Sequence, residues 1–367
     1  MKEEQLTCSV CGALLTEETQ REFDGEIMCE HCLREQTTIC ECCEERVWRD
    51  NAESDSFISV CNDCYDDLYT RCEECDCLIR RDDAHYDGDY PYCDDCYDKL
   101  DNKAIKTYDY KPEPIFYGSG DLFYGVELEI DKGGEYNDNA EILLDLANRP
   151  AEHLYCKHDG SINNGFEMVS HPMSLDYHTN QMDWCDVFNK AITMGYRSHQ
   201  TSTCGLHIHV NRSAFGKNTL EQEDVIARIV HFTELHWNEL VKFTRRTEAN
   251  INHWASRYGI ATTAKDTYKN IKEKNWSRYV AVNLANYNTI EFRIFRGTLR
   301  YKTFIATLQL VDEICRLAIM FDDNTFEKMS WSDFAIGISK ENKPELIEYL
   351  KSKRLYVNEL QTETEEI

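Results

Sequence analysis

The chain has 367 residues, of which 42% are hydrophobic, and it carries 67 Asp and Glu against 40 Lys and Arg, a formal net charge of −27 at pH 7. So acidic a chain repels a phosphate backbone, which disfavours nucleic acid as a partner. Its first residues show no apolar leader and it has no run of about 18 apolar residues, so we expect a cytoplasmic protein without a membrane partner.

Twelve of the 18 cysteines repeat with a period of 32 residues, in three copies of the pattern Cys-x2-Cys-x17-Cys-x2-Cys. They fall within 8–32, 40–64 and 72–96 and are Cys8, Cys11, Cys29, Cys32, Cys40, Cys43, Cys61, Cys64, Cys72, Cys75, Cys93 and Cys96. Two such knuckles can close a tetrahedral zinc site, and so short a repeat buries little core without a metal. We therefore predict three LIM-like zinc ribbons in residues 1–100, each with one structural Zn²⁺.

A disulfide framework is the competing interpretation of these cysteines. It requires an oxidising compartment and normally a secretory signal, and the sequence shows no such signal. Within the zinc interpretation, Cys42 and Cys77 lie beside the repeat and could replace a ligand of their own ribbon. The two-residue spacing favours Cys43 and Cys75.

The acidity of the chain is concentrated in the ribbons, because residues 1–100 hold 9 Lys and Arg against 28 Asp and Glu. Such a surface excludes the DNA binding that zinc ribbons often provide. It suits a basic protein or peptide partner, or simply a soluble spacer, and the sequence leaves both open.

The cysteines become sparse from residue 101. Pro112, Pro114, Gly118 and Gly120 predict a linker over 101–121. Residues 122–354 are long enough for one domain with a substantial core, and 355–367 are predicted to be an acidic tail.

Four segments of this domain alternate apolar and polar residues as half-buried strands do: 124–131, 165–170, 204–211 and 289–294. Their polar faces carry ionisable groups, among them Glu127, Glu129, Glu167, His207, His209, Glu291 and Arg293. One such face would be ordinary solvent exposure, but four predict that the faces meet. Same-face neighbours lie about 6.7 Å apart on a strand, so a Glu-x-Glu pair can straddle two divalent ions. Oxygen ligands favour Mg²⁺ or Mn²⁺ there.

Helical periodicity predicts helices over 139–148, 184–194, 220–243 and 303–321, and a last helix that begins at Pro344. These helices are expected to cover one face of the sheet. Residues 245–277 are hard to interpret, because Arg245, Arg246 and several lysines fit either a mobile basic flap or a solvated helix face.

Five short segments, in this order and spacing, resemble the amidoligase family of glutamine-synthetase-like carboxylate-amine ligases. They are 125–129 (GVELE), 157–162 (KHDGSI), 165–172 (GFEMVSHP), 204–209 (CGLHIH) and 289–293 (TIEFR). The likeness extends over residues 122–321. It implies an α+β domain with a mainly antiparallel glutamine-synthetase-like sheet backed by helices. It also implies a reaction in which ATP phosphorylates a carboxylate and an amine attacks the acyl phosphate to give an amide or peptide-like bond.

The resemblance further implies roles for single residues. The ligands of the Mg²⁺ or Mn²⁺ ions would be Glu127, Glu129, Glu167, His209 and Glu291, with His207 as a further ligand or a substrate contact. The phosphates of ATP would be bound by Arg278, Arg293, Arg296 and Lys157, although Arg296 shares the polar face only if a bulge intervenes. Arg293 and Lys157 would also act in catalysis, and Asp159 would orient or deprotonate the attacking amine.

The sequence thus predicts an ATP- and magnesium-dependent ligase that joins an acid to an amine, either of which can be a small molecule. Its zinc arm would recruit a protein or peptide. A catalytically inactive zinc-binding adaptor is the alternative, and it requires that Glu127, Glu129 and Glu291 fail to converge. Metal-dependent hydrolysis, suggested by the pair His207-x-His209, is a weaker alternative because a Glu-x-Glu strand precedes that pair.

Overall fold

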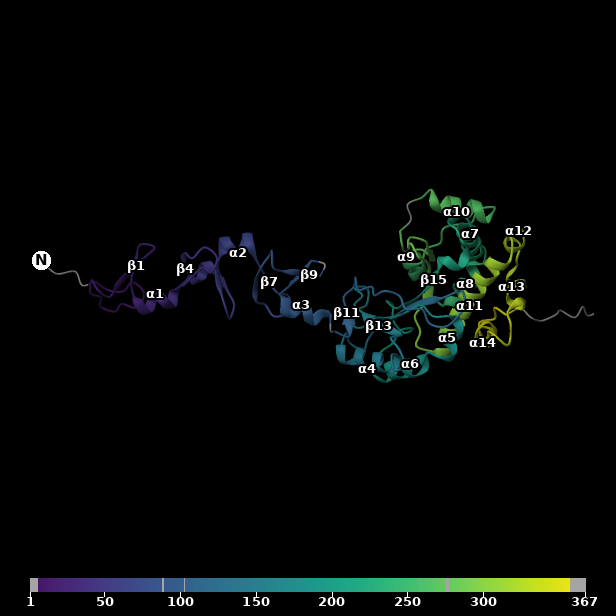
Figure 1. Cartoon of the computed structure of the whole chain (residues 1–367), viewed down its shortest axis with the longest axis horizontal. Helices are drawn as coiled ribbons and strands as arrows, with labels where there is room; N and C mark the ends of the chain where they lie inside the picture. The colour runs from purple at the N-terminus through teal and green to yellow at the C-terminus, as the bar shows by residue number, and fades with distance from the viewer. Residues whose placement is uncertain (1–5, 88, 102, 275–276, 357–367) are drawn as a thin grey trace, which may run out of the picture. The chain divides into compact units, whose positions relative to one another are not determined.

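The computed structural model describes residues 6–87, 89–101, 103–274 and 277–356 (Figure 1). The chain divides into two compact units, Met1–Lys103 and Ala104–Ile367. Among the described residues, no helix has both the length and the apolar character needed to cross a bilayer.

The first unit consists of short hairpins and short helices. Its elements are β1 (Gln20–Phe23), β2 (Glu26–Cys29), α1 (Glu30–Gln36), β3 (Thr37–Ile39), β4 (Arg46–Trp48), η1 (Arg49–Asn51), β5 (Ala52–Ser54), β6 (Ser59–Cys61), α2 (Asn62–Leu68), β7 (Tyr69–Arg71), β8 (Leu78–Arg80), β9 (His85–Asp87), β10 (Tyr90–Tyr92) and α3 (Asp94–Asp101). The second knuckle of each ribbon closes a hairpin and opens a helix, as Cys61 ends β6 and Cys64 lies in α2. Helix α1 continues directly into β3, and α2 into β7, so successive ribbons follow one another without a linker.

The apolar cores of the first unit are small. Met28 packs with Cys8 and Cys32 in one cluster, and Val60 packs with Cys40 in another. Cores of this size do not offset the conformational entropy lost on folding, and metal ions bound by the cysteines would supply the missing stability.

The second unit is organised around a seven-stranded sheet. The strands are β11 (Ile105–Lys106), β12 (Tyr124–Ile130), β13 (Leu154–Lys157), β14 (Phe166–Ser170), β15 (Gly205–Asn211), β16 (Val282–Asn283) and β17 (Thr289–Arg296). Their order across the sheet is β11-β13-β14-β12-β15-β17-β16, and every pairing is antiparallel except that of β11 with β13. The predicted α+β fold with a mainly antiparallel sheet is confirmed, and the four predicted strands are its central four.

Helices cover the apolar face of this sheet. The helices of the second unit are α4 (Asn137–Ala147), α5 (Leu175–Asn180), α6 (Trp184–Thr193), η2 (Arg212–Phe215), α7 (Thr219–Leu235), α8 (Trp237–Thr244), α9 (Glu248–Trp254), α10 (Ala264–Lys272), α11 (Tyr301–Met320), α12 (Asp323–Glu327), α13 (Trp331–Gly337) and α14 (Pro344–Ser352). Val126 and Leu128 of β12 are fully buried in one core with Trp184 of α6 and Phe304 of α11. This packing leaves the opposite face of the central strands for the polar side chains.

The predicted helix over 220–243 is wrong at its centre, because α7 ends at Leu235 and α8 begins at Trp237. His236 between them has φ −99° and ψ 32°, outside the helical region. Its Nε2 atom donates to the carbonyl of Met329 at 3.0 Å, and its ring packs against Phe232. These tertiary contacts stabilise the non-helical conformation of His236. The local sequence does not predict them.

The boundaries of the second unit differ from the predicted ones at both ends. The predicted linker over 101–121 contains β11, and Ile105 is buried, so the second unit already begins at Ala104. In the predicted tail over 355–367, Leu355 is buried and its carbonyl accepts a hydrogen bond from Trp331 Nε1 at 2.8 Å. Residues 357–367 lie outside the described part of the chain.

A buried histidine makes the second unit sensitive to acid. His178 Nε2 donates to the carbonyl of Tyr124 at 2.9 Å, while its Nδ1 accepts from Trp184 Nε1 at 3.1 Å, so the ring must be neutral. Burial lowers the pKa of His178 from its usual 6.5 to about 4. A group whose folded pKa is depressed in this way stabilises the fold above pH 6.5 and loses that contribution as the pH falls towards 4.

We therefore expect His178 alone to remove about 2 kcal/mol of unfolding free energy between pH 7 and pH 5. Urea unfolding at the two pH values, followed by tryptophan fluorescence, measures the loss, and His178→Gln should show a loss smaller by that amount. An NMR titration of the imidazole checks the same point without a variant. A measured pKa near 6.5 would contradict the prediction.

Candidate active site

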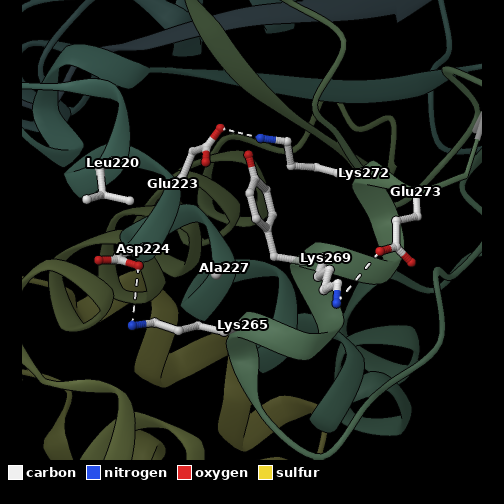
Figure 2. Close-up of a pocket in the computed structure, with 9 residues that line it drawn as sticks. Leu220, Glu223, Asp224, Ala227, Lys265, Lys269, Lys272 and Glu273 are labelled. Carbon is white, nitrogen blue, oxygen red and sulfur yellow. Dashed lines mark hydrogen bonds and ion pairs between the residues drawn. The ribbon is translucent and has the colours of Figure 1, made fainter.

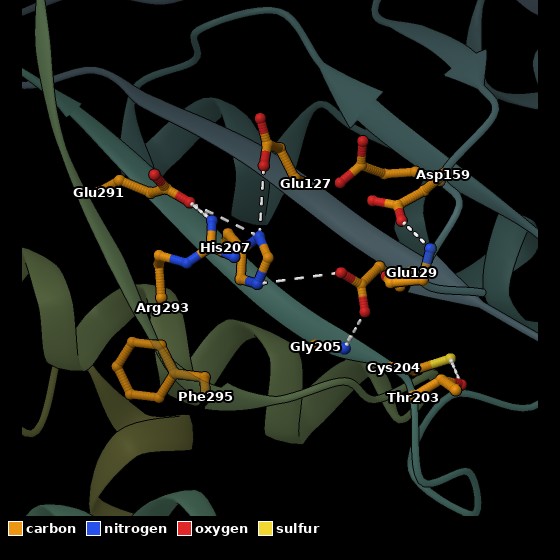
Figure 3. Close-up of polar contacts among 12 residues, drawn as sticks. Glu127, Glu129, Asp159, Thr203, Cys204, Gly205, His207, Glu291, Arg293 and Phe295 are labelled. Carbon is orange, nitrogen blue, oxygen red and sulfur yellow. Dashed lines mark hydrogen bonds and ion pairs between the residues drawn. The ribbon is translucent and has the colours of Figure 1, made fainter. Parts of the chain in front are cut away.

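Strand pairing gathers the predicted site residues on one face of the sheet. Glu127 of β12 lies opposite His207 of β15, and His209 lies opposite Glu291 of β17. On the other side of β12, Glu129 lies opposite Glu167 of β14. Directly paired residues on antiparallel strands share a face and stand close together. The register alone therefore brings four strands' carboxylates and imidazoles into one cluster (Figure 3).

Two groups in this cluster have the geometry to hold a metal ion: Glu127, His207 and Glu291 form one, and Glu129, Glu167 and His207 form the other, with the ligand atoms of each group within 4.8 Å of one another. His207 belongs to both groups. Its Nδ1 lies 3.3 Å from Glu127 Oε2 and 3.6 Å from Glu291 Oε1, and its Nε2 lies 4.0 Å from Glu129 Oε1. Two carboxylates with one imidazole suit Mg²⁺ or Mn²⁺. Glu127, Glu129 and Glu291 thus converge, which the adaptor alternative requires them not to do.

Burial makes the charged form of these carboxylates unfavourable, and a bound cation would stabilise that charged form. Glu129, Glu167 and Glu291 are each at most 5% exposed. Burial raises the pKa of Glu167 well above its usual range, and the charges of Glu127 and Glu129 raise it further. Burial likewise raises the pKa of Glu129. A bound divalent cation would keep both carboxylates ionised.

The histidines lower the pKa values of Glu127 and Glu291, whereas burial raises them. Burial opposes the ionisation of Glu127, but His209 and His207 outweigh it and hold the pKa of this carboxyl well below its usual range. The same two histidines lower the pKa of Glu291 against the effect of its burial. His209 Nε2 lies 3.2 Å from Glu127 Oε1, and its Nδ1 bonds Thr289 Oγ1 at 3.1 Å. His209 belongs to neither ligand group, so in this structure it is the charge partner of Glu127.

Glu291 is held from three sides. Asn283 Nδ2 donates to its Oε2 at 2.8 Å, Asn286 Nδ2 donates to the same oxygen at 3.3 Å, and Arg293 Nη1 bonds its Oε1. The two asparagines were not predicted from the sequence, because they stand outside any alternating pattern. They leave one oxygen of Glu291 directed towards His207 and Arg293 (Figure 3).

Arg296 reaches the site face through a β-bulge. Leu206 pairs with Phe295 but Ile208 pairs with Phe292, so β17 contains one residue more than β15 over this stretch. The insertion reverses the alternation beyond it, and Arg296 consequently pairs with Gly205 on the site face. Its guanidinium donates to the carbonyls of Arg245 and Thr201, each at 3.3 Å.

Arg246 is a further arginine that borders the site, whereas the sequence places it only among the basic residues of 245–277. Burial lowers its pKa to about 10, with the charge of Glu129 opposing that shift and those of Arg293 and Arg296 adding to it. A side-chain carbon at Gly205 would lie 2.6 Å from Arg246 Nη2 and 2.9 Å from His207 Nε2. The backbone N–H of Gly205 also bonds Glu129. Glycine at this position therefore lets the arginine and the histidine approach Glu129 together.

Of the three remaining predicted residues, two lie beside the cluster and one lies apart. Lys157 pairs with Glu167 across the sheet, and its Nζ lies 3.3 Å from Glu167 Oε2. Asp159 accepts from the backbone N–H of Ser161 at 2.7 Å and is close enough to raise the pKa of Glu129 and Glu167. Arg278 instead donates to the hydroxyls of Tyr108 at 3.0 Å and Tyr279 at 3.3 Å.

The ring of Tyr279 connects Arg278 with the cluster. The guanidinium of Arg278 lies 5.2 Å from the centre of this ring, and that of Arg293 lies 5.8 Å from it. The structure thus places Arg278 one aromatic ring away from Arg293, without an ion pair to any carboxylate among the described residues.

The first unit has three clusters of four cysteines that could each hold a metal ion. Two are the predicted sets Cys8, Cys11, Cys29, Cys32 and Cys40, Cys43, Cys61, Cys64. In the third, Cys72, Cys75 and Cys93 are joined by Cys77, whose Sγ lies 3.4 Å from that of Cys75. Cys96, the predicted fourth ligand, also interacts with Cys72, Cys75 and Cys93. Five thiols thus surround a site at which zinc takes four.

This surplus predicts that either Cys77 or Cys96 alone can complete the third zinc site. We expect Cys77→Ser and Cys96→Ser each to retain three zinc ions per chain, and the double variant to retain two. Metal analysis of the purified proteins, with the visible absorption of the Co²⁺-substituted forms, measures the number of sites and of thiolates. Loss of one zinc in a single variant would identify that residue as the one obligatory ligand.

A cavity of about 350 Å³ lies between α7 and α10, and its lining includes none of the cluster residues (Figure 2). Its charges are paired: Glu223 with Lys272 at 2.7 Å, and Asp224 with Lys265 at 3.6 Å. Helix α10 buries Ala264, Thr267 and Ile271. For the lysines of residues 245–277, the structure therefore favours a solvated helix face over a basic flap.

The fold and the cluster define a class of protein: an α+β domain whose antiparallel sheet presents two carboxylate-rich metal-binding groups. Residues 139–315 match the model of the family described as "Putative amidoligase enzyme". The match covers 177 of the 264 residues of the second unit and includes every described strand from β13 to β17. This part of the chain is thus similar to the amidoligase family, and the match supports a ligase-type enzyme. A search of curated proteins finds no match.

Proposed function

We propose that the second unit is an ATP- and Mg²⁺-dependent carboxylate-amine ligase, for which Mn²⁺ can replace Mg²⁺. One observation carries the proposal above the others. Two carboxylate-rich ligand groups share His207 on a face that Arg293 and Arg246 border, and they lie in a domain similar to the amidoligase family. Phosphoryl transfer requires little more than positioned metal ions and positive charge, which these groups can supply.

The reaction has two balanced steps. A carboxylate oxygen of the acid attacks the γ-phosphorus of ATP, and the bond to the bridging oxygen of ADP breaks. The amine nitrogen then attacks the acyl carbon, phosphate leaves, and the nitrogen gives up a proton. Bound divalent ions would neutralise the phosphate oxygens in the first step.

Four basic residues of this chain would bind the phosphates and the nucleotide. Arg293, held by Glu291, would neutralise charge on the phosphoryl group in transfer, and Arg296 and Lys157 would bind the outer phosphates. Lys157 now pairs with Glu167, so an ion bound at Glu167 would release its ammonium for this role. Arg278, beside Tyr279 and Tyr108, would bind the nucleotide further out.

Asp159 is the candidate for the base in the second step. It is half-buried in the turn after β13, and its charge already acts on Glu129 and Glu167. A carboxylate in this position could accept the proton that the attacking amine loses.

The zinc arm would recruit the substrate or a partner. Its strongly acidic composition favours a basic protein or peptide, and the proposal places the whole enzyme in the cytoplasm, where the thiols stay reduced. The acid and the amine can both be small molecules, or one can be a side chain of the recruited protein.

ADP release from Mg-ATP, measured across a panel of amino acids, polyamines and basic peptides, tests the proposal. We expect ADP release that requires both Mg²⁺ and one specific acid-amine pair, and mass spectrometry should show a product lighter than the sum of its reactants by one water. Equilibrium binding of ATP in the presence of Mg²⁺ gives a second readout. Absence of both turnover and nucleotide binding would refute the assignment.

A further inference from the structure

Three helix ends meet in a small basic cavity that the proposed reaction does not use. The cavity has a volume of about 100 Å³, and its lining includes Arg245, Arg300, Lys302 and Lys353. Arg245 ends α8, Arg300 precedes α11, and Lys353 follows α14. Residues far apart in the sequence thus bring four cations to one hollow.

Acidic residues do not balance these cations. The lining holds two carboxylates against the four cations: Glu348 pairs with Lys302 at 2.9 Å, and Glu345, which keeps its charge, accepts from the neutral amide Gln309 Nε2 at 2.7 Å. Among the residues that the structure describes, Arg245, Arg300 and Lys353 have no acidic partner within ion-pair distance. Burial lowers the pKa of Lys353, and the charges of Arg245 and Arg300 lower it further. Burial also lowers the pKa of Arg245, and the charges of Arg296 and Arg300 add to that shift.

Two further features point to an anion. Arg245 Nε is a buried donor that finds no hydrogen-bond partner within the described part of the chain. Helix α11 is 20 residues long, no side chain caps its N-terminus, and its first turn contains no acidic residue. The positive end of its dipole is therefore uncompensated where Arg300, Lys302 and Thr303 line the cavity.

We propose that this cavity is a binding site for a phosphate group, either free phosphate or the phosphate of a small monoester. Three unpaired cations from three elements suit a doubly charged oxyanion better than a single carboxylate. The aromatic ring of Tyr349 supports the site, because the guanidinium of Arg245 lies 5.6 Å from its centre and Lys353 Nζ lies 5.4 Å from it. The inference does not depend on the proposed ligase reaction.

Isothermal titration of the full-length, zinc-loaded protein with inorganic phosphate tests the site, without added Mg²⁺ and against sodium chloride of equal ionic strength. We expect one phosphate per chain. The double variant Arg300→Gln, Lys353→Gln should bind phosphate at least about tenfold more weakly, because each charge-assisted hydrogen bond contributes on that scale. Arg300 is exposed and Lys353 half-buried, so neither change threatens the core.

A matched control removes the same charge elsewhere. Lys340 and Lys351 are exposed and do not line the cavity, so Lys340→Gln, Lys351→Gln should bind phosphate as the unmodified protein does. Glu127→Gln, which changes the candidate active site, should also keep this phosphate. Titration with glycerol phosphate shows the source: tighter binding than phosphate identifies a phosphorylated ligand, and weaker binding identifies free phosphate.

Two results would overturn the inference. One is unchanged phosphate binding in the Arg300, Lys353 double variant. The other is phosphate binding that Glu127→Gln abolishes and the double variant retains, since the anion would then lie in the candidate active site. Neither result bears on ADP release, so this site and the proposed function fail separately.

Discussion

Replacing Glu127 by Gln is expected to lower the rate of ADP release about a thousandfold, or by about 4 kcal/mol of transition-state free energy. The carboxylate lies between His207 and His209 and belongs to the first ligand group. Glutamine keeps the size of the side chain but removes the charge that would hold a divalent ion. The measurements are kcat at saturating Mg-ATP and the Kd of Mn²⁺.

Glu141→Gln provides the matched control, because Glu141 is exposed on α4. It should leave both quantities unchanged. Circular dichroism should show the same fold in both variants. If Glu127→Gln kept more than about a tenth of the activity, the ligand group would not serve the reaction, since a lost metal ligand costs several kcal/mol.

Removing zinc with a chelator is expected to unfold the first unit and to leave the second folded. The small clusters around Met28 and Val60 contribute little, whereas a structural zinc ion contributes about 10–16 kcal/mol of binding free energy. Metal analysis before treatment should give three zinc ions per chain. Limited proteolysis and circular dichroism before and after treatment should then locate the loss of structure in residues 1–103.

After Mg²⁺ is added back, the chelated protein should still ligate a small-molecule amine and should lose any binding of a basic protein partner. Cys185→Ser serves as the control, because this cysteine is exposed in the second unit and should not affect zinc content. Resistance of the first unit to the chelator, together with disulfide-linked peptides in mass spectrometry, would favour the disulfide framework instead.

The parts of the fold that the sequence predicts are those with long regular patterns. Strands β12 and β15 each alternate over seven residues, and the four central strands were all found. Strands β11 and β16 have two residues each, too few for any period to appear. Helix α10 buries only Ala264, Thr267 and Ile271, so its polar residues conceal its helical pattern.

The same reasoning explains which residues of the cluster the sequence predicts to lie together. The predicted residues lie on strands, where alternation with a period of two puts them on one face and the pairing register then brings them together. They are Glu127, Glu129, Glu167, His207 and Glu291. Arg246, Asn283 and Asn286 reach the site through packing and loops, which have no periodic signal. The side of Arg296 depended on a bulge, which alternation alone cannot show. In the third zinc site, Cys77 and Cys96 are both candidates for the fourth ligand, and the structure places both thiols near the other three cysteines.

The sharing of His207 between the two ligand groups limits how both can be filled. A neutral imidazole has one nitrogen lone pair in the ring plane and one N–H, and His207 directs Nδ1 towards Glu127 and Glu291 but Nε2 towards Glu129. An ion that takes Nδ1 selects the tautomer with the proton on Nε2, facing Glu129, and an ion that takes Nε2 selects the reverse. In its neutral form the His207 ring would therefore serve as a ligand in only one of the two groups at a time, and the other group would rely on its carboxylates.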